Sequence, residues 1–188
     1  MGAITTTVEG FSISHAAILD PETGLEETFG DVYGVNSGSL DLTLGSFSNV
    51  GDDAILSVWD WVESAAVSVQ AGYISFALIA LLTGTSLSSS GAGDSIQYSM
   101  ELWDETSFNI AEKPMRIRIP SRDSSSNTRL LDIILYKVKF KPIVFTGIAY
   151  KEGLKINYDG VALLSDTDHE GNSLTNKSIG RLISLASS

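Results

Sequence analysis

The sequence predicts a mainly β protein: an antiparallel β-sandwich or half-barrel with one short buried α-helix at about residues 74–83 and long loops. Three observations lead to this prediction. Apolar and polar residues alternate with period two over most of the 188 residues, which is the pattern of half-buried strands. Turn-forming Pro and Gly residues separate these runs. Only residues 74–83 are apolar without alternation, and Gly84 follows them as a left-handed helix cap.

Before the helix, the alternation predicts strands at residues 4–19 (one long strand or two), 26–35, 39–44, 54–58 and 65–72. Pro21 and Gly24 lie between the first two segments and favour a hairpin turn, because Pro presets φ and Gly relaxes the chain. A break is predicted at residues 36–38 and a loop at residues 47–53. The leucines of the third segment all face one way.

After the helix, strands are predicted at residues 95–103, 115–119, 130–145, 147–157 (as part of a hairpin) and 161–164. Residues 86–93 are rich in Ser and Gly and are predicted to form an exposed flexible loop. Residues 121–127 form a polar loop in this interpretation. The whole of 1–188 is predicted to be a single domain, with a possible N-terminal arm at 1–10 and a C-terminal tail at 166–188.

The apolar stretch at residues 65–82 is long enough to span a membrane. It contains Ser68 and Gln70, however, and no Lys or Arg flanks it. A buried strand that runs into the helix is the better interpretation, and no membrane partner is predicted. The chain has no Cys, which excludes disulfides. It begins with neither a basic segment nor an apolar run, so we expect synthesis in the cytoplasm.

Charge is distributed very unevenly along the chain. The first 112 residues carry 16 of the 23 carboxylates and no Lys or Arg, a formal charge of −16. The last 76 residues carry 7 carboxylates and all 12 basic side chains, a charge of +5. A field of one sign destabilises a compact chain and is relieved by an opposite surface. Either the two parts cover each other, or successive copies stack acid to base.

The order of elements around the helix resembles that of a known family. Residues 61–74, from Trp61-Val62-Glu63 to Gly72-Tyr73-Ile74, lead into the apolar helix and Leu82-Thr83-Gly84. This run resembles the major tail tube proteins of long, non-contractile-tailed bacteriophages. The later run 138–150, from Val138-Lys139-Phe140 to Ile148-Ala149-Tyr150, is similar to the closing strands of that family. The similarity covers about residues 30–165 as a pattern of elements.

The resemblance implies a structural virion protein without catalytic activity or cofactor. Six copies would close into a ring whose sheets form an inner barrel, and stacked rings would form a tail tube that delivers the genome. The expected partners are other copies of the chain together with tape-measure, tail-tip and tail-terminator proteins, and viral DNA would pass through the lumen without specific binding. The expected location is the tail of the virion, after synthesis in the host cytoplasm.

Two alternatives stay open at this stage. One is a monomeric β-sandwich that binds carbohydrate or acts as an adhesin, with a tryptophan as its platform. The other is a capsid decoration or tail-completion protein, which would form trimers or a single ring. The first differs from the tube in requiring exposed tryptophans that a ligand quenches.

Sequence motifs for chemistry are weak. His15 and His169 are far apart, and no nucleophile-elbow spacing supports a hydrolase. Gly91-Ala92-Gly93 lacks the spacing of a dinucleotide fingerprint. Residues 166–171 begin like a calcium loop, but the twelfth position is Lys177 where a bidentate carboxylate is needed. Asp52-Asp53 is interpreted as a solvated turn. No catalytic, cofactor or metal site is predicted.

A basic stripe is the main candidate for binding, with members that alternate along two strands: Arg116, Arg118, Lys137, Lys139 and Lys141. The net charge of −11 and the absence of interleaved aromatic residues argue against nucleic acid, so an acidic protein neighbour is favoured. Trp59, Trp61 and Trp103 are predicted to lie in the core or to anchor an interface. These eight residues are the predicted subunit and ring interface.

Overall fold

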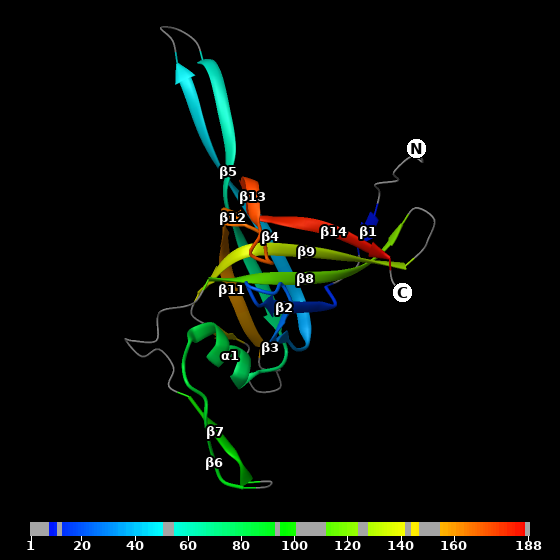
Figure 1. The fold of residues 1–188 in the computed structure, drawn as a ribbon, viewed down its shortest axis with the longest axis vertical. Helices are drawn as coiled ribbons and strands as arrows, with labels where there is room; N and C mark the ends of the chain where they lie inside the picture. The colour runs from blue at the N-terminus through cyan, green and yellow to red at the C-terminus, as the bar shows by residue number, and fades with distance from the viewer. Residues whose placement is uncertain are drawn as a thin grey trace.

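The protein is described by a computed structural model, which covers residues 8–10, 13–50, 55–92, 95–100, 112–123, 128–141, 144–146 and 155–186. The predicted fold class is confirmed, since the described residues form antiparallel sheets and one short helix (Figure 1). The elements before and including the helix are β1 (Val8–Gly10), β2 (His15–Leu19), β3 (Glu26–Val32), β4 (Val35–Val50), β5 (Ile55–Ala71) and α1 (Phe76–Thr83). Those after it are β6 (Ser88–Ser90), β7 (Gln97–Ser99), β8 (Glu112–Asp123), β9 (Thr128–Phe140), β10 (Val144–Thr146), β11 (Lys155–Leu163), β12 (Ser165–Thr167), β13 (Ser173–Ser178) and β14 (Gly180–Ala186).

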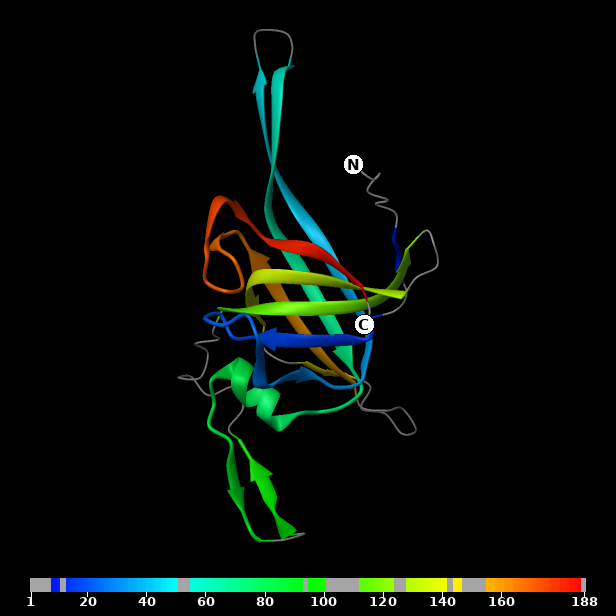
Figure 2. The ribbon, with the colours of Figure 1, turned by 45° about the vertical axis from the view of Figure 1, so that its right-hand side comes forward.

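One large sheet contains ten of these strands. Its main path runs β3-β2-β8-β9-β11-β5-β4, while β1 pairs with β8, β10 with β11 and β14 with β9. The sheet bends into two layers that cross steeply, with β2, β8, β9 and β14 in one layer and β4, β5 and β11 in the other (Figure 2). It does not close, which fits the predicted half-barrel.

A β-bulge in β9 marks the place where the sheet divides. Lys113 of β8 pairs with Val138 and Met115 pairs with Leu135, so β9 has one extra residue at this point. On one side of the bulge β9 pairs with β14, and on the other it pairs with β11. The bulge also changes which residues face the core. Leu135 before it and Val138 after it both point inward, whereas Tyr136 packs in a second cluster on the opposite face.

The main core lies between the two layers. Ile18, Met115 and Ile117 come from one layer, and Val69 and Tyr158 come from the other, each at most 3% exposed. Along β5 and β8 such positions recur at every second residue, which is the alternation that predicted strands at 65–72 and 115–119. The second, smaller cluster packs Leu19, Ile134 and Tyr136 against Leu174 and Ile183 of the C-terminal strands.

The helix α1 matches the predicted one and closes one end of the core. Ser75 is its N-cap and accepts a hydrogen bond from the Leu78 amide at 3.2 Å. Gly84 ends it with φ 69°, the left-handed conformation expected of a glycine cap. Leu78, Ile79 and Leu82 are buried. The membrane-length stretch is therefore the end of β5 followed by this helix, as predicted. Among the described residues, no helix has the length and apolar character to cross a bilayer.

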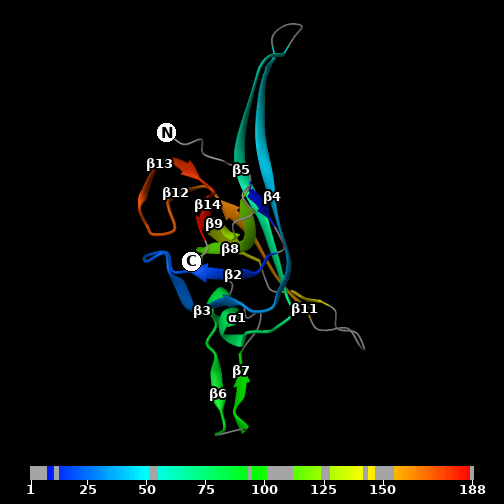
Figure 3. The ribbon, with the colours of Figure 1, turned by 90° about the vertical axis from the view of Figure 1, so that its right-hand side faces the viewer.

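Two hairpins extend from opposite ends of the body (Figures 1 and 3). The longer one consists of β4 and β5, and the shorter one consists of β6 and β7. The predicted break at 36–38 was wrong, because the chain turns at Tyr33 and Gly34 and residues 36–38 are already in β4. Residues 47–50 also continue β4 instead of starting a loop, and the predicted loop at 86–93 contains β6.

The C-terminal segment is more ordered than predicted. The expected polar tail at 166–188 contains β13 and β14, and β14 joins the large sheet along seven residues of β9. Part of the expected N-terminal arm is likewise a strand, β1, which pairs with β8. Residues 1–7 lie outside the described part of the chain.

Candidate functional site

The two arginines of the predicted basic stripe lie on the outer face of the layer formed by β2, β8, β9 and β14. His15 of β2 stands opposite Arg118 of β8, and Arg118 stands opposite Asp132 of β9. Residues directly opposite in antiparallel strands project to the same face. Arg116, two residues from Arg118, projects there as well, which agrees with the predicted shared face of these arginines.

Arg118 and Asp132 form the most buried ion pair of this face. The Nε and Nη2 atoms of Arg118 donate to the two carboxylate oxygens of Asp132, each at 2.7 Å. Asp132 is only 3% exposed. The hydrogen bonds from Arg118 to Asp132 raise the pKa of the guanidinium, which therefore stays charged at neutral pH. This bidentate geometry fixes the register of β8 against β9.

Three further ion pairs join the acidic part of the sequence to the basic part. Lys113 contacts Glu27, and Arg116 contacts Glu26. Lys137 Nζ lies 2.7 Å from Glu112 Oε2, and this hydrogen bond is the main reason that the pKa of Lys137 is raised. Burial is the first cause of a lowered pKa at Arg116, and the neighbouring charge of Arg118 is the second. The two parts of the chain therefore cover each other, at least along this face.

These ion pairs reduce the number of residues in the predicted interface that can bind a neighbouring molecule. Arg116, Arg118 and Lys137 already have acidic partners within the chain. Lys139 and Lys141 are exposed, and neither has an ion-pair partner among the described residues. They are the members of the stripe that remain available to an acidic neighbour.

Of the three predicted tryptophans, Trp61 has a side chain within the described part of the structure. Trp61 lies in β5 and is 49% exposed. Its indole covers Gly45 of β4, where a Cβ atom would come within 2.5 Å of the ring. Trp59 is also in β5, but its side chain is outside the described part of the structure, as is the whole of Trp103. Their interface role stays a prediction.

In the turn at residues 166–171, which begins like a calcium loop, hydrogen bonds from within the turn occupy the carboxylate of Asp168. Asp168 Oδ1 accepts hydrogen bonds from the amides of Glu170 and Asn172, both at 2.9 Å. Asp168 Oδ2 accepts one from Asn172 Nδ2 at 3.2 Å. The backbone therefore uses this side chain as an Asx turn, in agreement with the interpretation as an ordinary acidic turn.

His169 within this turn is buried at 5% exposure. Its ring stacks on Tyr136 with centroids 6.2 Å apart, and its Nε2 accepts a hydrogen bond from Arg181 Nη2 at 3.1 Å. Burial lowers the pKa of His169, and the positive charge of Arg181 lowers it further. His15 and His169 lie on separate parts of this face, so the structure does not bring them into one site.

Exposed apolar residues on both hairpins were missing from the predicted interface. On the long hairpin they include Leu42, Leu44 and Val62, at 61%, 62% and 38% exposure. On the short hairpin and its flanks, Ile96 and Tyr98 are 44% and 56% exposed. The alternating leucines of β4 were a visible signal, but sequence alone cannot show that Leu42 and Leu44 lie where the long hairpin leaves the body and stay exposed.

Comparison with models of known protein families finds no match for this chain, and comparison with curated proteins finds none either. The similarity to tail tube proteins thus depends on the residue pattern alone.

Proposed function

We propose that this protein is a structural subunit of a bacteriophage tail tube and that it assembles through its two opposed hairpins. The observation that carries the proposal is that two hairpins extend from opposite ends of one β body (Figure 3), with exposed apolar side chains at the base of the long hairpin and on the short one. A subunit that repeats along an axis needs a contact surface at each end. A monomeric binding module needs only one.

The long hairpin provides the stronger part of the argument. Leu42, Leu44 and Val62 lie on paired strands, with Leu44 directly opposite Val62. Side chains of this size are usually buried, and an exposed cluster of them at the base of the hairpin marks a contact surface. A second copy of the chain would remove them from water, with each fully buried leucine contributing roughly 2 kcal/mol.

The open sheet also supports assembly. The strands β3 and β4 end the main path of the sheet, so each has one edge without a described partner. Long unpaired edges promote association with another chain. In the proposed ring, sheets of neighbouring subunits would continue across such edges into a barrel. The net charge of −11 would make a lumen that repels DNA, so the genome could slide through it.

The proposal is tested by negative-stain electron microscopy of the purified protein, with sedimentation beside it. We expect rings or hollow tubes for the wild type. The double variant Leu42→Ser/Leu44→Ser should remain folded by circular dichroism but lose the tubes, because its hairpin no longer offers an apolar surface.

Thr43→Ala is the matched control, since Thr43 is exposed between these two leucines and points to the other face of the same strand. It should form tubes like the wild type. A wild-type protein that stays monomeric at high concentration, or tubes that form equally well from the double serine variant, would contradict the proposal.

A further inference from the structure

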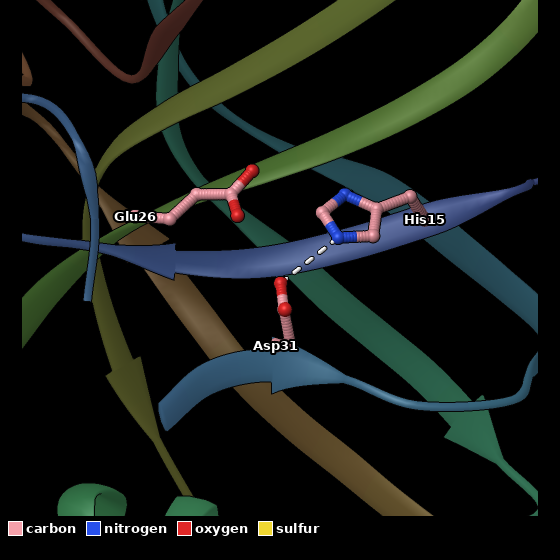
Figure 4. Close-up of side chains that lie close together, drawn as sticks. All are labelled: His15, Glu26 and Asp31. Carbon is pink, nitrogen blue, oxygen red and sulfur yellow. Dashed lines mark hydrogen bonds and ion pairs between the residues drawn. The ribbon is translucent and has the colours of Figure 1, made fainter. Parts of the chain in front are cut away.

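Three potential metal ligands converge on the outer face of β2 and β3. His15 lies in β2, and Glu26 and Asp31 lie in β3. One ligand atom from each lies within 4.8 Å of the other two. Figure 4 shows the imidazole and both carboxylates directed toward a common space from three sides. Two of them already touch, since His15 Nε2 is 2.9 Å from Asp31 Oδ1.

We propose that His15, Glu26 and Asp31 bind a divalent transition-metal ion, with Zn²⁺ as the best fit to this ligand set. The inference does not depend on the tail tube proposal. It concerns a site on the subunit itself, away from the hairpins.

The chemistry of the ligands favours such an ion. One imidazole nitrogen and two carboxylate oxygens suit zinc and its neighbours, whereas Ca²⁺ and Mg²⁺ prefer oxygen ligands alone. Zinc binds these atoms at about 2.0–2.2 Å, so its ligand atoms lie roughly 3.4 Å apart in a tetrahedral site. Each of the three side chains is about one-third exposed. They can therefore rotate by the small amount needed, and water can supply the fourth ligand.

The hydrogen bonds around His15 leave its imidazole free to bind a metal ion. His15 Nδ1 is buried and has no hydrogen-bond partner in the described part of the chain. Its Nε2 makes the ring's polar contact, with Asp31. A metal ion would occupy the place of the proton that Nε2 and Asp31 now share, and would join both groups to Glu26. The neutral ring keeps its one proton, which moves from Nε2 to Nδ1 when the ion binds at Nε2.

Arg116 is the internal competitor for this site. Its Nη2 contacts Oε1 of Glu26, which leaves the second oxygen of that carboxylate for an ion. With the imidazole neutral, Glu26, Asp31 and Arg116 together carry a charge of −1. The charge of the nearby Arg118 is already balanced by Asp132. The site therefore attracts a dication, but less strongly than one without the arginine.

The backbone holds the three ligands in fixed positions. β2 and β3 pair directly, with Ala17 opposite Asp31, and β2 also pairs with β8. Sites built on strands keep their geometry better than sites on loops. The ligands thus need no large backbone movement to bind an ion.

Isothermal titration calorimetry with ZnCl₂ on the metal-free wild-type protein tests the proposal. We expect one ion per chain. The variants His15→Asn, Glu26→Gln and Asp31→Asn should each weaken binding by more than about tenfold, since loss of even an outer-shell partner costs roughly 10- to 100-fold. Glu27→Gln is the matched control, because Glu27 is the next residue and pairs with Lys113 outside the cluster. It should bind Zn²⁺ like the wild type.

A second readout protects the test against misfolded variants. Co²⁺ added to the wild type should give visible d–d absorption that Zn²⁺ abolishes, and it should raise the thermal midpoint of unfolding. A wild type that binds no Zn²⁺ overturns the proposal. So does an equal loss of affinity in Glu27→Gln, which would indicate unspecific binding to acidic side chains.

Discussion

At the scale of single residues, Asp132 shows how this chain uses its charges. A carboxylate that is 3% exposed is costly to bury unless it is paired. Its bidentate pair with Arg118 meets that need and leaves it available for no other partner. A buried pair of this kind adds little net stability but disfavours other registers, since a shifted strand would leave both charges unpaired.

His169 makes the stability of the subunit depend on pH. Burial of its ring is the main reason that its pKa is lowered, and the positive charge of Arg181 lowers the pKa further, so the neutral form is favoured. Glu170 and Asp168 oppose this shift, Arg116 adds to it, and Tyr136 stacks on the ring. The unfolded chain takes up a proton near pH 6.5 while the folded chain does not, so stability is present above that pH and is lost as the pH falls below it.

The measurement is urea unfolding of the subunit between pH 7.5 and 5. We expect the free energy of unfolding of the wild type to decrease as the pH is lowered. The decrease should be smaller in His169→Gln, which keeps an acceptor for Arg181. Identical pH profiles for the two proteins would show that His169 is not responsible.

At the scale of elements, the approach of β14 to β9 is unusually close at Gly180. A Cβ atom there would lie 2.2 Å from the carbonyl oxygen of Ile134. Gly180→Ala must therefore push β14 away from β9, and we expect a loss of about 1–3 kcal/mol in the free energy of unfolding, as for overpacked cores. Chemical denaturation measures it.

Gly72→Ala serves as the control for that substitution. Its nearest neighbour would be the flexible amide of Asn36 at 3.2 Å, and it has no backbone contact closer than 3.7 Å. We expect a change of about 0.5 kcal/mol or less, as for ordinary surface substitutions. Equal losses in both variants would mean that the close approach of β14 to β9 is not the cause of the destabilisation.

The sequence predicted the type of most elements and few of their partners. Alternation identified strands such as β3, and Gly84 with the apolar run identified α1. It divided β11 into the end of a hairpin at 147–157 and a separate strand at 161–164. Turns were located less well. Asn36-Ser37-Gly38 has better turn residues than Tyr33-Gly34, yet pairing with β5 keeps residues 36–38 in β4. The bulge in β9 was missed for a similar reason, since it depends on where β14 and β11 attach.

The candidate site was predictable to a similar extent. That Arg116 and Arg118 share a face follows from strand alternation. Their partners Glu26 and Asp132 do not, because Glu26 is 90 residues away in the sequence and reaches Arg116 only through the pairing of β2 with β3 and β8. The ligand cluster of His15 depends on the same pairing, so no local motif could reveal it.

At the scale of the whole molecule, much of the basic charge is neutralised within the subunit. In the tube proposed above, we therefore expect only Lys139 and Lys141 of the stripe to guide the stacking of rings. Lys139→Glu/Lys141→Glu should leave the subunit folded and shorten or abolish its tubes, because two cations that could face an acidic neighbour are reversed. Electron microscopy and sedimentation at low and high salt measure this effect.

The double glutamine variant at the same positions calibrates the result. Neutralisation should weaken assembly less than charge reversal does, and added salt should reduce the difference because exposed charges are screened. Tubes of normal length from the double glutamate variant at low salt would show that these charges do not guide stacking.

The shared strand β9 has a consequence for how the chain folds. It pairs with β8, the strand before it in sequence, with β11, which follows the short strand β10, and with β14, which follows some 45 residues later. The pairing of β2 with β8 spans about 100 residues. Such long-range pairings close slowly, whereas the β4–β5 hairpin joins strands only a few residues apart and can form first. In the proposed assembly, a newly made chain would thus present its long hairpin, with the exposed leucines at its base, before its body is complete. The speed of body closure would then decide between ordered assembly and aggregation.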